Sequence, residues 1–274
     1  IMEALLNYCE QVPLWHKVTL IVFCFMIFSQ LERIRPVSIF NYKKWNHAGL
    51  NLVFLLFNSA INILFGIIMV GIFQWIGKNE IGLLHFFTLP IWVELLIGIL
   101  LLDFFSQYLA HYVIHQIPWL WNFHTIHHSD SEVDVSTGTR HHPGDFLVRE
   151  VFALVAIVLG GIPMTYYVFY RLCTIFFTYF THANILVPSW LDQPLSWIFV
   201  TPNIHKFHHH ATQPWTDSNF GNVFSFWDRI FGTLIYDDPR KVSFGLDVFD
   251  ENGKDQLTVL LKHPFSSSRS LTEG

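Results

Sequence analysis

The sequence predicts an all-α integral membrane protein in which about four transmembrane or re-entrant helical units are capped by a cytoplasmic, histidine-rich helical domain. Composition is the first reason: 52% of the 274 residues are hydrophobic and only 14% are charged, against roughly 25% in soluble domains. The second is a series of apolar stretches long enough to cross a bilayer. The third is that twelve of the sixteen histidines lie between His111 and His210, in groups with helical spacing.

We expect a single membrane-embedded domain over 1–274, because no Pro-, Gly- or Ser-rich linker divides the chain. Within it we expect N-terminal membrane helices over 1–110, a histidine-rich catalytic region over 111–236 and a C-terminal cytoplasmic tail over 237–274. Residues 1–17 lack the basic start and small-residue cleavage site of a secretory signal, so we expect them to be retained. The net charge of −5 comes without a basic stripe, which argues against a nucleic-acid partner.

Three apolar stretches predict membrane-spanning helices over 18–31, 50–76 and 91–109. Each is long enough, alone or with its flanking residues, to cross about 30 Å of hydrocarbon. The third contains Asp103. An ionisable residue inside an apolar span points either to a functional role or to a buried, hydrogen-bonded structural role.

A fourth apolar stretch, 147–179, is interrupted at its centre by Gly160, Gly161 and Pro163. Because these residues break helices, we expect two short helices joined by a tight turn. Such a hairpin enters and leaves the membrane on one side. The Trp-bearing stretch 188–202 that follows predicts a segment at the membrane interface.

The distribution of basic residues predicts the orientation. The loop after the first span contains Arg35, Lys43 and Lys44, whereas the loop after the second span contains only Lys78. Cytoplasmic loops carry the excess of Lys and Arg, so the first loop is expected in the cytoplasm. Three crossings then place the metal site on the cytoplasmic face.

The histidine groups have the spacing of metal ligands. Residues three or four apart share one face of an α-helix, so each group can direct two or three imidazoles at one point. Eight or more nitrogens exceed the three or four that one zinc site uses, which predicts two metals. The groups are His111-x3-His115, His124-x2-His127-His128 and His205-x2-His208-His209-His210, with His141, His142 and His182 between them. We expect no ligand among the isolated histidines His16, His47, His85 and His263.

The surrounding residues limit the chemistry. Neutral imidazoles add no negative charge, so the metals would stay strongly positive and open to a small molecule such as dioxygen. The sequence lacks both the Glu-x-x-His pair of carboxylate-bridged di-iron bundles and the His-Glu-x-x-His of zinc proteases. Aspartates near the groups are candidates to accept the second N–H of a ligating ring, although the sequence does not match them to particular histidines. They are Asp130, Asp134, Asp145, Asp217 and Asp228.

Several motifs over residues 95–236 resemble the fatty acid hydroxylase and sterol desaturase superfamily. Besides the histidine groups, in the same order, they are Arg140-x-His142-Pro143, Phe180-Thr-His182-Ala-Asn184, Asp217-x-Asn219-Phe220-Gly221 and Phe226-Trp227-Asp228-Arg229-x-Phe-Gly232-Thr233. The resemblance implies as metal ligands His111, His115, His124, His127, His128, His182, His205, His208 and His209. Some branches have another histidine where this chain has Thr178, so His142 is expected either to complete the ligand set or to lie behind it. His141 and His210 are expected behind the ligands or towards solvent.

The resemblance implies a membrane-embedded di-iron oxidoreductase that hydroxylates or desaturates a lipid C–H bond with O2 and external electrons. The cofactors would be two iron ions, with zinc replacing them in purified protein in some cases. The electrons would come from a separate protein, cytochrome b5-like or ferredoxin-like, since no haem or flavin motif is present. Asp217, Asp228 and Arg140 are the candidates to support the catalytic centre, and Arg140 is also a candidate to meet a lipid head group. The sequence leaves open the lipid, the choice between hydroxylation and desaturation, and the oligomeric state.

Two other classes of function compete with this prediction. A membrane metal transporter or storage protein also binds ions through histidine clusters, but transport sites lie near the bilayer midplane, often between internal repeats, and no repeat is visible. A di-zinc hydrolase acting on a lipid ester would normally use a carboxylate as ligand or base close to the metals. The histidine groups beyond the ends of apolar spans favour the oxidoreductase.

Overall fold

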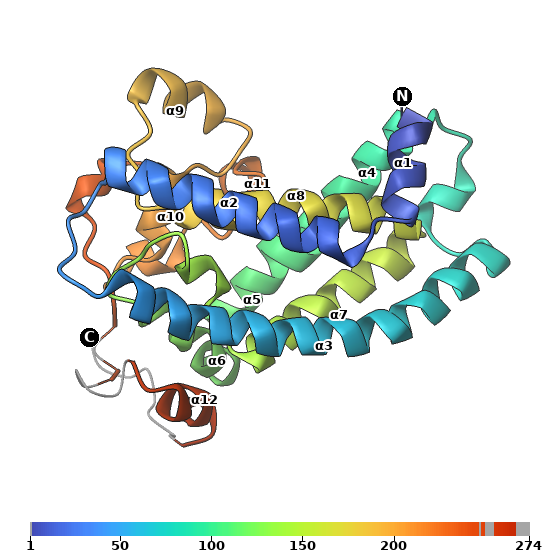
Figure 1. Ribbon diagram of the computed structural model, residues 1–274. Helices are drawn as coiled ribbons and strands as arrows, with labels where there is room; N and C mark the ends of the chain where they lie inside the picture. Colours follow the sequence, from blue (N-terminus) through green and yellow to red (C-terminus); the bar gives the residue numbers. More distant parts are fainter. Residues whose placement is uncertain (1, 247, 250–254, 267–274) are drawn as a thin grey trace.

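The computed structural model describes residues 2–246, 248–249 and 255–266, and within these ranges the chain forms helices and loops without a β-strand (Figure 1). The predicted all-α membrane fold is confirmed. The α-helices are α1 (Met2–Glu10), α2 (Leu14–Ile34), α3 (Lys44–Asn79), α4 (Ile91–Asp103), α5 (Ala110–Gln116), α6 (Pro118–His128), α7 (Pro143–Gly160), α8 (Met164–His182), α9 (Ser189–Leu195), α10 (Pro202–His208), α11 (Phe226–Ile230) and α12 (Leu257–Ser266). Single turns are η1 (Leu83–Phe86), η3 (Thr137–Thr139), η4 (Trp215–Asp217) and η5 (Pro239–Lys241), and η2 (Phe104–Leu109) is π-helical.

Prolines set where many of these helices begin. A proline has no N–H to leave unpaired in the first turn, and its fixed φ suits that position. It stands at the first turn or at the residue just before the helix in α2, α4, α6, α7, α8, α9 and α10, as Pro13, Pro90, Pro118, Pro143, Pro163, Pro188 and Pro202. Helix starts are therefore encoded locally in much of the chain.

Three helical segments are long and apolar enough to cross a membrane: Leu14–Ile34, Lys44–Phe86, in which a short loop separates α3 from η1, and Ile91–Gln116. Each extends beyond the apolar stretch that predicted it, because polar residues such as Lys44 and Lys78 continue the helix past its apolar centre. Large apolar side chains on α3 point away from the protein, among them Leu56, Ile63 and Ile67. Such a surface suits contact with lipid.

The third segment changes helix type on its way to the first histidines. Between α4 and α5, the π-helical turn η2 accommodates an extra residue in the helix, as often occurs at functional sites. Asp103 lies at the junction, where it accepts hydrogen bonds from the Tyr170 hydroxyl (2.7 Å) and Trp227 Nε1 (2.9 Å). Of the two roles considered for Asp103, the structure shows the buried, hydrogen-bonded one, which ties α4 to α8 and α11.

The stretch 147–179 forms the expected hairpin of two helices, α7 and α8. Gly161 ends α7 in the left-handed conformation with φ of 64°. A Cβ on Gly82, in the loop after α3, would lie 2.1 Å from the Gly161 nitrogen, so the two loops are in direct backbone contact. The helices extend to Pro143 and His182 at the other end, so α8 carries its histidine to the opposite end of the bundle.

The long helices α2, α3, α4, α7 and α8 run lengthwise, with α6 and α9 to α12 gathered at one end and α1 at the other (Figure 1). The hairpin is the centre: α8 packs against α2 and α4, and α7 packs against α3 and α4. Buried Leu102, Ile157 and Tyr170 lie in the main core. At the end of the bundle that contains α6 and α12, Leu260 of α12 packs with Phe54 and Ile126.

The stretch 188–202 contains the short helix α9 and leaves Trp190 and Trp197 largely exposed. Exposed tryptophans suit the level of lipid head groups, in agreement with the predicted interfacial segment. The predicted tail over 237–274 is described only in part, and there α12 packs against α6.

Candidate metal centre

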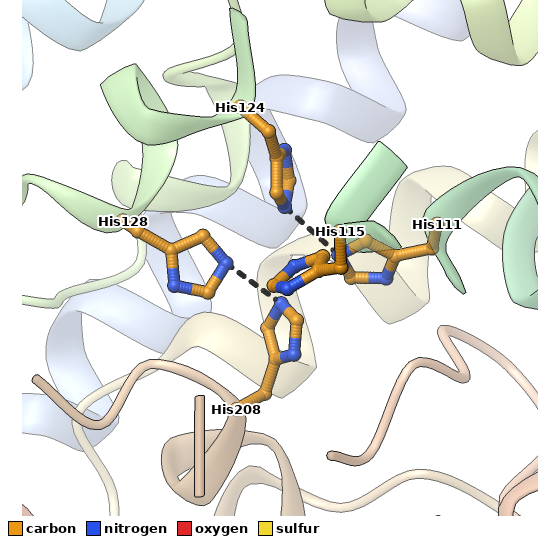
Figure 2. Close-up of side chains that lie close together, drawn as sticks. All are labelled: His111, His115, His124, His128 and His208. Atoms are coloured by element: carbon orange, nitrogen blue, oxygen red, sulfur yellow. Dashed lines mark hydrogen bonds between the residues drawn. The ribbon is translucent and has the colours of Figure 1, made fainter. Parts of the chain in front are cut away.

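Nine histidines form two buried clusters at the capped end of the bundle. The ligand atoms within each cluster lie within 4.8 Å of one another. The first cluster consists of His111, His115, His124, His128 and His208 (Figure 2). The second cluster consists of His127, His182, His205 and His209. The structure thus brings together nine of the ten histidines that the sequence proposed as ligands.

The spacing within each motif divides its histidines between the clusters. In α6, His124 and His128 lie four residues apart and face the first cluster, while His127 faces the second. The motif at α10 divides in the opposite sense, with His208 in the first cluster and His205 and His209 in the second. The clusters are adjacent, because the rings of His128 and His209 stack with centroids 5.0 Å apart. Each His-x2-His-His motif therefore contributes to two neighbouring sites.

The Nδ1 atoms of several rings are occupied by acceptors behind the clusters. His111 donates to the Phe220 carbonyl, His208 to the Ser218 carbonyl and His182 to the Thr178 carbonyl, each at 2.8 Å. His115 pairs with Asp217 and His124 with Asp145, each at 3.0 Å. A carbonyl can only accept, and an ionised carboxylate likewise, so these rings carry their proton on Nδ1. Their Nε2 lone pairs are left facing the cluster centres.

These lone pairs come unusually close together. The Nε2 atoms of His111 and His124 are 2.9 Å apart (Figure 2). Because both rings carry their proton on Nδ1, this contact brings two acceptors together and lacks a donor. Two nitrogens that bind one metal at about 2.1 Å with a right angle between them would lie about 3 Å apart. The separation suits two ligands of one cation, and the same holds for His182 Nε2 and His205 Nε2 at 3.0 Å.

Unpartnered nitrogens point to the same conclusion. His115 Nε2 and both nitrogens of His209 are buried without a hydrogen-bond partner among the described residues. Burial lowers the pKa of His124 to about 3, so the ring is neutral and its lone pair is available at neutral pH. Burial likewise lowers the pKa values of His127, His128, His205, His208 and His209 well below the usual range. Buried neutral imidazoles with unsatisfied nitrogens fit divalent metal ions in both clusters.

The three supporting candidates occupy different positions. Asp217 contacts a cluster ring directly, through His115. Asp228 touches no cluster histidine; it accepts the backbone N–H groups of Phe220 and Gly221 and the Thr233 hydroxyl, and so fixes the loop whose Phe220 carbonyl holds His111. Burial raises the Asp228 pKa to about 6.

Arg140, the third candidate, is almost fully buried behind α6. Its Nε donates to the Ile126 carbonyl at 2.9 Å, and its other nitrogens donate to Asn51 and Ser129. The residues that line the cavity beside the histidines do not include Arg140. It braces the end of α6 rather than facing a lipid.

The neighbours His141 and His142 occupy different positions, and of the two alternatives for His142 the structure does not show the ligand position. His142 is the N-cap of α7: its Nδ1 accepts from Gly144 N, and its Nε2 donates to the Leu261 carbonyl at 3.2 Å. Both nitrogens are thus occupied away from the clusters. His141, expected behind the ligands or towards solvent, stacks on His127 with centroids 4.1 Å apart and lines the cavity. His210 lies outside both clusters and stacks on Trp215.

Asp145 has a larger role than the sequence indicated. Its Oδ2 accepts from His124 Nδ1 at 3.0 Å and from His141 Nδ1 at 2.6 Å, and its Oδ1 accepts from Arg149. The position of Asp145 in the first turn of a helix, three residues after His142, was the feature of the sequence that could have indicated this role. A separate buried pair joins His47 and Asp130 at 2.8 Å, and His47 belongs to neither histidine cluster.

A cavity of about 190 Å³ lies beside the histidines, between the membrane helices. His111 of the first cluster and His127, His182 and His205 of the second face it. Its other walls come from α2, α3, α7 and α8 and are largely apolar, with Ile21, Leu55 and Ile175 among the lining residues. A second cavity of about 150 Å³ continues along α3, with Glu150 lining both.

Fold and site together define an all-α membrane protein with a paired histidine centre open to an apolar cavity. The model of the fatty acid hydroxylase family matches residues 95–233, just over half of the chain, and the chain belongs to that family. The match begins in α4 and ends after α11, so it contains all nine clustered histidines.

Similar proteins include ornithine lipid hydroxylase OlsE from Rhizobium tropici, 29% identical over 177 residues, which cover 65% of this chain and 52% of the relative. An alkylglycerol monooxygenase from Caenorhabditis elegans is 30% identical over 156 residues, which cover 56% of this chain and 29% of the relative. A cholesterol 25-hydroxylase-like protein from Caenorhabditis briggsae is 26% identical over 193 residues, covering 65% and 61%. The chain therefore spans about half or less of the length of the first two relatives. No solved structure matches significantly.

Proposed function

We propose that this protein is a membrane di-iron oxidoreductase that uses O2 and external electrons to hydroxylate or desaturate a lipid C–H bond. The observation that carries the proposal is the pair of adjacent all-nitrogen clusters, with Nε2 lone pairs converging beside an apolar cavity. Such a ligand set leaves divalent ions positively charged and able to activate a small molecule. The cavity offers a place for a lipid chain beside them.

The nine clustered histidines would hold the two ions, five around one and four around the other. His141 is the candidate for a tenth ligand, because its ring stacks on His127 while Asp145 occupies its Nδ1. When bound, iron would supply the one-electron and O2 chemistry that amino-acid side chains lack. Asp145, Asp217 and the carbonyls of Phe220, Ser218 and Thr178 would hold the rings in the ligating tautomer.

The protein's remaining task is to position the lipid and exclude water. The histidine cap is buried under α6, α10 and the loop from Asp217 to Thr233, which shields the reacting atoms from solvent. On the cavity side, Ile175 and Leu55 offer apolar contacts to a chain. A rigid chain position relative to the clusters would decide which C–H bond is attacked.

The names of the similar proteins support lipid oxidation: one is an ornithine lipid hydroxylase and another an alkylglycerol monooxygenase. We extend to this chain the coarser class, oxidation of a membrane lipid. The multi-pass topology, the cytoplasmic face of the histidine cap and an electron donor resembling cytochrome b5 or a ferredoxin belong to the same proposal, supported by the distribution of Lys and Arg and by the three apolar helices.

The alternatives have less support. A di-zinc lipid hydrolase would use a carboxylate as ligand or base at the metals, whereas the two clusters consist of histidines and the neighbouring Asp145 and Asp217 pair with Nδ1 of His124 and His115. A transporter would place its ligands near the midplane of the bilayer. The clusters lie instead at the capped end of the bundle, on α5, α6, α8 and α10 (Figure 1).

The decisive experiment is O2 labelling of a lipid extract. Protein purified from an iron-supplied host without chelators should contain two metal ions per chain. With a reduced ferredoxin and 18O2, it should transfer one labelled oxygen to a lipid or form an alkene in an unlabelled lipid. Iron-loaded, reduced protein that yields neither product across sterol, acyl, ether and sphingolipid substrates would overturn the proposal.

A further inference from the structure

One face of α8 forms a continuous wall of the cavity beside the histidines. Thr174 and Ile175 lie three and four residues after Arg171, Thr178 lies four and three residues after them, and His182 lies four residues after Thr178. The five residues therefore share this face, and all of them line the cavity. At 1.5 Å per residue, Arg171 and His182 are roughly 16 Å apart along the helix axis. The cavity therefore reaches from the second cluster to a cationic side chain that the reaction does not require.

Charged side chains gather at this far end. Arg171 Nη1 lies 2.9 Å from Glu150 Oε1, and the Tyr167 hydroxyl donates to Glu150 Oε2 at 3.1 Å. Glu150 is buried, and its Oε1 forms this ion pair but has no hydrogen-bond partner among the described residues. The Arg171 side chain keeps 28% of its exposure, and its guanidinium has five N–H donors, of which Glu150 occupies only part. The free donors belong to a side chain that lines the cavity.

The charges around the two cavities, which share Glu150 in their walls, do not balance. The cations are Lys17, Arg149 and Arg171, while the carboxylates are Glu150 and the partner of Arg149, Asp145. Lys17 makes no ion pair among the described residues. An unbalanced positive charge among membrane helices is costly, because little water is present to solvate it. An anionic group bound between Lys17 and Arg171 would remove that cost.

The surroundings of this charged end suit a lipid. Ile21 of α2 and Leu55 of α3 line the first cavity, and Phe65 and Val70 of α3 line the second. Figure 1 shows α2 and α3 on the same side of the α7–α8 hairpin, so the cavities lie between membrane helices. Near the histidine end, the Tyr179 hydroxyl is buried without a partner among the described residues, although its ring lines the cavity.

We propose that Arg171, assisted by Lys17, binds an anionic group of the lipid substrate, a phosphate or a carboxylate, while the chain of the lipid lies along α8 towards the histidines. The inference rests on the proposed function, since it assumes that the lipid in this cavity is the one oxidised. In this proposal Arg171 determines the specificity for lipids that carry an anionic group. It also places the oxidised carbon far along the chain from the anionic group, because the two ends of the cavity are separated by three turns of α8.

Binding measurements on the whole chain with its metals bound, in nanodiscs of zwitterionic lipid and without an electron donor, test this directly. Hexadecanoic acid and hexadecanol share a chain and differ in the anionic group. We expect wild-type protein to bind the acid about tenfold more tightly than the alcohol at pH 8, and Arg171→Gln to abolish that preference without weakening alcohol binding. Unchanged alcohol binding shows that the variant has folded. Arg171→Lys should keep part of the preference, and Arg240→Gln, at an exposed site, should keep all of it.

Two further measurements identify the anionic group that is preferred and test the ion pair between Arg171 and Glu150. Hexadecyl phosphate bound more tightly than the acid supports a phosphate head group, and the reverse order supports a carboxylate. Glu150→Gln should tighten binding of either anion, because it leaves Arg171 without a competing partner. Equal binding of acid, phosphate and alcohol by wild-type protein would overturn the proposal, as would a preference that survives Arg171→Gln. These assays measure binding without turnover and need neither O2 nor electrons, so their failure is distinct from a failure to detect lipid oxidation.

Discussion

His141 stacks on His127 with ring centroids 4.1 Å apart, whereas the next residue, His142, caps α7 and donates to the Leu261 carbonyl. Two adjacent histidines therefore face opposite directions. We predict that His141→Ala lowers the metal content of the second cluster and lowers lipid oxidation at least tenfold. His142→Ala should leave the metal content unchanged and loosen the docking of α12. Metal analysis of both variants checks this, and metal loss confined to His142→Ala would contradict it.

The first cluster gives a second matched pair of variants. His208 belongs to the cluster, while His210, two residues later, lies outside it on Trp215. We predict that His208→Ala lowers the metal content, because it removes one of the five nitrogens that would surround the first ion and opens that side of the site. His210→Ala should retain both ions. Equal metal content in the two variants, measured by mass spectrometry of the elements, would show that His208 is not a ligand.

Gly138 tests the packing around the second cluster. A Cβ at this position would lie 2.8 Å from the Thr178 carbonyl oxygen and 3.0 Å from His182 Nδ1. Since the backbone of α8 cannot yield as a flexible side chain would, we predict that Gly138→Ala displaces His182 and lowers metal occupancy and activity. Gly66→Ala is the control, because nothing lies within 4 Å of its added Cβ. Full metal occupancy in Gly138→Ala would mean that η3 shifts without disturbing His182.

We predict that Asp228 stabilises the fold, although it contacts no histidine of either cluster. Removing its carboxyl leaves the N–H groups of Phe220 and Gly221 and the Thr233 hydroxyl without their partner. We expect Asp228→Ala to lower the free energy of unfolding by on the order of 3 kcal/mol. Thermal unfolding in detergent measures this effect. Asp237→Ala, at an exposed site, should have a much smaller effect, and equal shifts would contradict the role assigned to the loop.

Cysteine labelling tests the proposed orientation. Lys78, just beyond the apolar part of α3, and Lys241, in the cap, are both exposed. In a variant lacking the three native cysteines, Lys78→Cys should react with an impermeant maleimide added outside intact cells, while Lys241→Cys should react only after the cells are opened. If both cysteines reacted from outside, the histidine cap would lie on the outer face of the membrane, which would contradict the proposed orientation.

Sequence reasoning predicted the helical class and the hairpin because these depend on local properties. Apolar length and helix-breaking residues such as Gly161 and Pro163 are visible in any short window of the sequence. Nine of the ten proposed ligands also meet in the clusters, since i, i+3 and i, i+4 spacing constrains direction on a helix. The residues on helices were thus the ones best predicted.

The directions of the side chains at 141 and 142 could not be predicted from the sequence. Both residues lie in the turn before α7, where no helical period applies. His142 turns outward because it caps α7 and meets a carbonyl of α12, a contact between segments distant in the chain. The roles of Asp145, Arg149 and Arg171 likewise depend on how the hairpin packs. Tertiary contacts of this kind leave no pattern in a single sequence.

The division of each His-x2-His-His motif between two clusters bears on how the protein is assembled. Neither cluster is complete until α10 is present, because His208 and His205 supply one ligand each to the two sites from a helix that is synthesised after all the membrane helices. The emerging chain would therefore insert without its metals, and loading would follow as a late maturation step. Once loaded, the ions would act as two cross-links that tie the cap to the hairpin and to the third membrane segment, so metal limitation would lower the amount of folded protein.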